Sequence, residues 1–141
     1  MTNYINPTKE QIEKFNALDL KEPILMLNML KFRELADYPE GSPWAGKGLT
    51  GAEAYAEYGK LIAPMLEKIG AKMAVFGVAE TTLIGPDEAW DEVFMMHYPA
   101  AGLFLEMATD KDYVEKVQIH RTAAVEDSRL IRVKQMGSPV G

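Results

Sequence analysis

The residue best suited to chemistry in this sequence is an asparagine inside an apolar run. Asn28 stands within ILMLNMLKFR, residues 24–33, where most neighbouring side chains are hydrophobic. A buried amide without a hydrogen-bond partner costs about 1–3 kcal/mol. The amide therefore either bonds to neighbouring backbone at a bulge or points into a ligand pocket, and the sequence leaves both alternatives open.

A second apolar run, residues 90–98, ends in His97 and Tyr98 directly before Pro99. A phenol can donate or accept a hydrogen bond, and an imidazole titrates near neutral pH and can act as a general base. We take Asn28, Tyr98 and His97 as candidate catalytic residues. The alternative for His97, and for His120 further along the chain, is a structural or exposed histidine.

Motifs for metal, nucleotide or nucleophilic chemistry do not accompany these residues. The chain has no cysteine, and its two histidines form neither an HxH nor an HExxH motif. The glycines fit neither GxGxxG nor GxxxxGK, and there is no GxSxG. We therefore expect no metal site and no cofactor.

Composition narrows the class of protein. A chain of 141 residues with 48% hydrophobic residues fits one globular domain. Its net charge of −6 and its isoelectric point near 5.0 argue against a nucleic-acid partner, which needs clustered basic residues. A signal-peptide core and a membrane-length apolar stretch are both missing from the sequence. We expect a cytoplasmic protein with neither nucleic-acid nor membrane partners.

Capping signals and hydrophobic periodicity predict the elements that position the candidate residues. Thr8 with Gln11, and Thr50 with Glu53, have capping-box spacing and predict that helices begin there. Pro64 should kink or split the second of these helices. The pattern predicts helices over 8–19, 51–70, 100–108 and onward from a cap at Thr109, and strands over 24–33, 72–84, 90–98 and 129–136.

The order of these elements predicts an α+β fold, a ferredoxin-like βαββαβ sandwich in one domain, residues 1–141. Residues 8–19 would be an extra N-terminal helix. Residues 34–50 would be a long lid-like loop. In that loop, Trp44 either contacts a ligand or covers an end of the core.

The sheet should present one apolar face to the helices and a second apolar face to something else. We expect the strand over 24–33 to lie beside, and parallel to, the strand over 90–98. Alternation would put Leu25, Leu27 and Met29 under the helices and leave the Asn28 side uncovered by its own chain. An apolar face of that size predicts a homodimer, packed sheet to sheet, with a cavity in each half.

Three stretches, MLNMLKFR, GAEAYAEYG and WD…YPAAGLFLEM…DKDYVEKVQIHRTAAVEDSRL, resemble the family catalogued as domain of unknown function 1330, within the dimeric α+β barrel superfamily. The resemblance covers most of the chain after Pro23 and implies a dimeric α+β barrel. The leading helix and the 34–50 loop depart from the shorter family form. Haem degraders of this fold bind iron through a histidine on the helix after the third strand, and residues 100–107 contain none.

The resemblance and the apolar lining together predict a small-molecule site. Superfamily relatives include cofactor-free monooxygenases and lactone isomerases, so we expect a cofactor-independent monooxygenase or isomerase acting on a small apolar or aromatic compound. The alternative is a non-catalytic dimeric module that is structural or binds a ligand. The side chains expected to bind a small organic ligand are Met26, Asn28, Leu30, Phe32, Trp44, Tyr55, Tyr58, Trp90, Phe94, Met96, Tyr98, Phe104, Met107 and Arg121.

Overall fold

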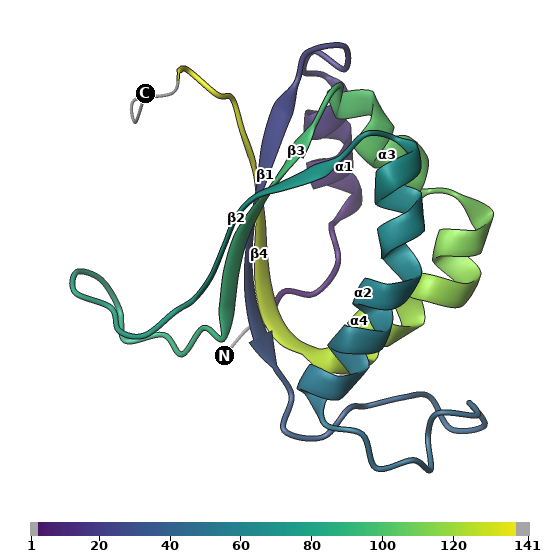
Figure 1. The fold of residues 1–141 in the computed structure, drawn as a ribbon. Coiled ribbons are helices and arrows are strands. Elements are labelled where there is room, and N and C mark those ends of the chain that lie inside the picture. Colours follow the sequence, from purple (N-terminus) through teal and green to yellow (C-terminus); the bar gives the residue numbers. More distant parts are fainter. Residues whose placement is uncertain (1–2, 138–141) are drawn as a thin grey trace.

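The computed structural model, which describes residues 3–137, has a four-stranded sheet with its helices on one face (Figure 1). The elements are α1 (Lys9–Asn16), β1 (Ile24–Phe32), α2 (Gly51–Lys68), β2 (Lys72–Val78), β3 (Glu92–Tyr98), α3 (Ala101–Ala108), the π-helix η1 (Tyr113–Val117), α4 (Gln118–Ala124) and β4 (Val125–Val133). No helix in this part of the chain is both long and apolar enough to span a membrane.

The strand order β2-β3-β1-β4, with every neighbouring pair antiparallel, is that of an α+β ferredoxin-like fold, as predicted. The prediction that β1 and β3 run parallel is wrong, since Asn28 pairs with Phe94 in an antiparallel ladder. The helix α2 returns the chain to β2, which runs parallel to β1. The hairpin then places β3 between them, antiparallel to both.

Local capping predictions have mixed outcomes. Both capping boxes, at Thr8 and at Thr50, form as predicted. The helix α2 continues unbroken through Pro64, so the predicted split is absent. Thr109 does not cap the next helix, because its hydroxyl donates to the Leu105 carbonyl; Asp110 instead accepts from the N–H of Asp112 at 2.9 Å.

Several strand boundaries also differ from expectation. The strands β2 and β3 are shorter than the pattern predicted, and residues 79–91 form a loop that projects beyond the sheet (Figure 1). The loop carries Leu83 and Ile84, which are both more than nine-tenths exposed. The strand β4 begins at Val125, four residues before the predicted start, and follows α4 directly.

The helices cover the face of the sheet opposite to the predicted one. Met26 and Leu30 of β1, and Phe94, Met96 and Tyr98 of β3, are buried on the helix side. The outer face carries their alternating neighbours: Leu25, Leu27, Met29, Val93, Met95 and His97. Alternation separates the two sets correctly, but since both sets are apolar it does not determine which one the helices cover.

Candidate functional site

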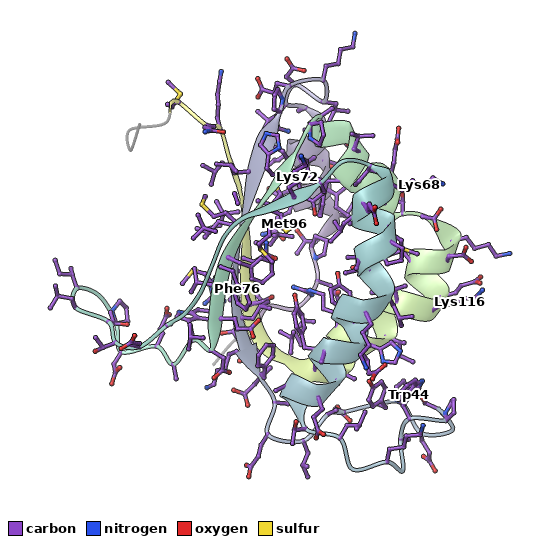
Figure 2. The ribbon with its side chains drawn as sticks, in the orientation of Figure 1. Trp44, Lys68, Lys72, Phe76, Met96 and Lys116 are labelled. Carbon is purple, nitrogen blue, oxygen red and sulfur yellow. The ribbon has the colours of Figure 1, made fainter. Side chains whose placement is uncertain are left out.

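A cavity of about 1500 Å³ lies between the sheet and the helices. Its sheet wall comes from β1 and β3, and its helix wall from α2, α3 and η1. The N-terminal segment 4–8 and α1 also line the cavity. In Figure 2, Met96 lies between the sheet and α2. Ligand pockets usually occupy about 300–1000 Å³, so this cavity has room for a small organic molecule.

Regular spacing in three elements produces the apolar lining. Met26 of β1 and Phe94 of β3 point to the helix side because strand side chains alternate. On α2, Tyr55, Tyr58 and Ile62 recur at intervals of three and four residues and so share one helix face. The lining therefore follows from the two periodicities of the sequence.

Asn28 lines the cavity, and the NH2 group of its side-chain amide is hydrogen-bonded within its own strand. Its Nδ2 donates to the Met26 carbonyl at 3.1 Å. The sheet irregularity in β1 lies between Lys31 and Phe32, so no bulge surrounds Asn28. Its Oδ1 has no hydrogen bond to any residue in 3–137 and remains an acceptor at the cavity wall.

Tyr98 places a phenol in the same cavity. The side chain is only 4% exposed, and its ring packs edge-on against Phe104 with centroids 5.5 Å apart. The hydroxyl has no hydrogen-bond partner in the described part of the chain. Burial raises the pKa of Tyr98, and the nearby Tyr113 and Tyr55 raise it further, so the phenol stays neutral. Tyr98 therefore offers a hydrogen-bond donor to a bound molecule.

Three further tyrosines line the helix side. The hydroxyls of Tyr58 and Tyr113 lie 2.9 Å apart, and the rings of Tyr55 and Tyr58 are 5.2 Å apart. Burial raises the pKa of Tyr58 well above its usual value, and burial also raises that of Tyr55. Tyr55 and Tyr58 therefore stay neutral and can donate hydrogen bonds.

Two charged side chains of the lining are placed by α4 and β3. Arg121 is partly buried; its Nη1 donates to the Ile5 carbonyl at 2.6 Å and its Nη2 to Ser128 Oγ at 3.3 Å. Glu92 begins β3, and burial together with the neighbouring Asp91 raises the pKa of its carboxyl. A carboxyl with a raised pKa is a suitable acid or base for proton transfer.

The cavity brings together ten of the fourteen predicted ligand-binding residues: Met26, Asn28, Tyr55, Tyr58, Phe94, Met96, Tyr98, Phe104, Met107 and Arg121. The remaining predicted residues do not line it: Leu30, Phe32, Trp44 and Trp90, and the catalytic candidate His97 is likewise outside.

Each residue outside the cavity has another environment. Leu30 is fully buried in the core, and Phe32 packs on Tyr55. Trp44 lies edge-on to the His120 ring, away from Met96 (Figure 2). The remaining two are Trp90, whose indole N–H donates to Glu88, and His97, which lies on the outer face of the sheet. A catalytic role for His97 stays a prediction, and His97 does not line this cavity.

Sequence reasoning missed Glu92, Tyr113 and Ser128, as well as the N-terminal segment, as parts of the lining. Glu92 shares its strand side with Phe94 and Met96, and that alternation could have identified it. Nothing in the sequence shows that residues 4–8 lie along β4. They do so because Tyr4 N–H donates to Asp127 and Ser128 Oγ donates to the Tyr4 carbonyl.

Metal ligands do not converge in this structure. Within residues 3–137, no three histidine, cysteine, aspartate or glutamate side chains are grouped so that they could hold a metal ion.

Comparison with known proteins places the chain among proteins of unknown function. A family model described as "Domain of unknown function (DUF1330)" matches residues 48–134. The protein of unknown function RPA0582 from Rhodopseudomonas palustris is 46% identical; the match covers 97% of this chain and all of that one, with a TM-score of 0.86. The structure of methylated RPA0582 gives 48% identity over both full chains and a TM-score of 0.87.

A more distant structure comes from Bacteroides fragilis. It is described as a dimeric protein of unknown function with a ferredoxin-like fold, and it is 14% identical, with a TM-score of 0.48 over 80% of this chain and 96% of that one. No curated protein matches the sequence.

Proposed function

The chain belongs to the family described as Domain of unknown function (DUF1330), and since that description names no activity, we propose a function from the cavity: it binds a small apolar or aromatic organic molecule. The lining supports this proposal because aromatic and methionine side chains surround a few polar groups. That composition is typical of small-molecule sites.

The observation that carries the proposal is the unpaired hydroxyl of Tyr98. The Tyr98 hydroxyl has no protein partner among residues 3–137 and belongs to a side chain that lines the cavity. Asn28 on the neighbouring strand lines the same cavity and keeps a free acceptor. A bound phenol or amide would satisfy both groups, because each can donate to Asn28 Oδ1 and accept from the Tyr98 hydroxyl.

Turnover is the more specific form of this proposal. A cofactor-independent monooxygenase or isomerase needs groups that orient a substrate and one that moves a proton. Asn28 and Tyr98 serve the first role, and the Glu92 carboxyl, with its raised pKa, serves the second. A non-catalytic module with a barrel filled by its own side chains is less favoured, because the cavity is open.

Asn28→Leu should weaken binding of cinnamamide, a neutral aromatic amide, by about 1–3 kcal/mol, because the Asn28 Oδ1 acceptor is lost while the fold is kept. Titration calorimetry measures the affinity, and thermal unfolding of the same sample measures stability. Asn16→Leu is the matched control, since Asn16 is exposed at the end of α1 and does not line the cavity.

The two measurements separate the two roles of the amide. The bond from Asn28 to the Met26 carbonyl predicts a modest loss of stability, about 1 kcal/mol, in the leucine variant. A large fall in melting temperature with unchanged cinnamamide affinity would remove Asn28 from the site.

The outer face of the sheet supports a homodimer, packed sheet to sheet. Leu25, Leu27, Met29, Val93 and Met95 form a continuous apolar surface that no helix covers. The edge strand β2 extends this surface with Val75, which pairs with Met95 and is 61% exposed. Large contiguous apolar patches often mark an interface. A second copy of the chain would cover this apolar face with its own identical face.

Sedimentation of the wild-type chain at micromolar concentration should therefore give about twice the 15.7 kDa mass of one chain. Leu27→Glu should yield monomers, because it buries a carboxylate in the interface. Leu35→Glu is the control, since Leu35 is 66% exposed on a loop away from the sheet. A wild-type chain that sediments as a folded monomer would contradict the dimer.

A further inference from the structure

We propose that the cavity selects an organic carboxylate, with the Arg121 guanidinium as its anion-binding group and the apolar lining as the site for the ligand body. This inference rests on the proposed function, and it names the chemical class of the ligand.

The lining contains basic side chains although the chain as a whole is acidic. The chain has a net charge of −6, with 21 acidic and 15 basic residues. The lining includes the basic residues Lys72, Arg121, Arg129 and Arg132 and the acidic residues Glu67 and Glu92, but Arg129 and Arg132 are each paired with a carboxylate outside the lining. The attraction for an anion therefore depends on the Arg121 guanidinium itself and not on the charge of the whole cavity.

Among the three arginines of the lining, Arg121 differs in having no carboxylate partner within residues 3–137. Arg129 pairs with Asp127 at 2.9 Å and Arg132 with Glu22 at 3.1 Å. Arg121 instead donates to two neutral oxygens, the Ile5 carbonyl and Ser128 Oγ. A partly buried cation is normally compensated by an anion, and here a bound carboxylate would provide the compensation.

The two neutral contacts also orient the guanidinium. One connects it to the N-terminal segment and the other to β4, so the planar group is held between two walls of the cavity. A guanidinium has five N–H donors in a fixed fork, which leaves donors for a ligand after these two bonds. That fork matches the two oxygens of a carboxylate.

Neutral phenols add donors to the same cavity. Tyr55 and Tyr58 line it together with Arg121, and burial raises the pKa of both phenols, so they stay protonated. The Tyr55 hydroxyl has no hydrogen bond to any residue in the described part of the chain. It therefore offers a further donor to a ligand bound in this cavity.

Apolar side chains form much of the rest of the lining. Met26, Phe94 and Met96 form its sheet side, and Ile62 and Leu66 form its helix side. An aromatic or aliphatic body would lie between these walls, with its carboxylate directed to Arg121. The ligand class that fits is thus an arylalkyl or similar carboxylic acid in its ionised form.

Cinnamate and cinnamamide, which share one shape and differ in charge, test this inference by titration calorimetry at neutral pH. Wild-type protein should bind cinnamate at least about tenfold more tightly than cinnamamide, because a charge-assisted hydrogen bond is stronger than a neutral one. Arg121→Gln should reduce this ratio to about one, and Arg121→Lys should keep part of it. Arg33→Gln, outside the cavity lining, is the matched control and should preserve the wild-type ratio.

The affinity ratio distinguishes anion binding from a structural role. If Arg121 only secured the N-terminal segment, its replacement would weaken both probes equally and leave the ratio unchanged, which overturns the inference. Equal affinity of both probes for the wild-type protein would also overturn it while leaving the proposed function intact. Failure of both probes to bind at about 1 mM would overturn the proposed function itself.

Discussion

Gly51→Ala should lower the unfolding free energy by about 3 kcal/mol or more, at the upper end of the cost of overpacking, because the added methyl group has no space. The N–H of Gly51 donates to the Arg33 carbonyl at 3.0 Å, and Arg33 N–H donates to the Ala124 carbonyl at 2.8 Å. A Cβ on Gly51 would lie 2.7 Å from the Ala124 carbonyl oxygen and would press on the backbone of Arg33. Backbone atoms cannot move aside by changing rotamer, so β1, α2 or α4 would have to shift.

The same helix provides the matched control. A Cβ on Gly59, also in α2, would meet nothing within 4 Å. Gly59→Ala should therefore stabilise the protein by about 0.5–1 kcal/mol, because alanine favours helix more than glycine does. Thermal and urea unfolding of both variants measure the difference. A Gly51→Ala variant with wild-type stability would show that the junction of β1, α2 and α4 is looser than the structure has it.

The order of the elements and part of the cavity lining could be predicted from local signals. Thr8 and Thr50 show capping boxes because the partner residue stands three positions away, a spacing visible in any sequence. Met26, Phe94 and Met96 reach the cavity through strand alternation, and Tyr55 and Tyr58 through helical spacing. These relations depend on a few neighbouring residues, so the sequence carries them directly.

The covered face of the sheet could not be predicted in the same way. Leu25, Leu27 and Met29 are as apolar as Ile24, Met26 and Leu30, so hydrophobicity gives no reason to choose between the two sides of β1. The direction of β3 relative to β1 depends on how the hairpin inserts into the sheet. The covered face and the direction of β3 both depend on contacts between segments far apart in the chain. Hydrophobic periodicity reflects only neighbouring residues and does not predict such contacts.

The environment of His120 is a second case in which distant segments meet. The loop between β1 and α2 folds back on α4, so that Tyr38 OH lies 2.7 Å from His120 Nδ1 and the Trp44 ring packs edge-on at 4.8 Å. His120 is thereby only 2% exposed. The sequence alone left this histidine either structural or exposed. The structure makes it a buried side chain that fixes the loop.

The stability of the protein should therefore decrease as the pH falls below about 6.5, the ordinary pKa of histidine. Burial lowers the pKa of His120, an effect that the negative charge of Glu57 opposes. The unfolded chain then binds a proton that the folded chain resists, so the stabilising contribution is complete above about pH 6.5 and is lost as the pH falls toward the folded-state pKa. One such group changes the unfolding free energy by at most about 1.4 kcal/mol per pH unit.

Comparison with His120→Gln isolates this contribution. A neutral imidazole can accept the Tyr38 hydroxyl at Nδ1 whereas a protonated one cannot, so the stability advantage of wild type over the variant should be largest at about pH 8 and should shrink toward about pH 5. Glu92, whose pKa burial raises, changes the stability in the opposite direction as the pH falls. It does so equally in both proteins, so its effect cancels when the stability of the variant is subtracted from that of the wild type. A constant difference between wild type and His120→Gln over this pH range would show that His120 stabilises the loop by packing alone.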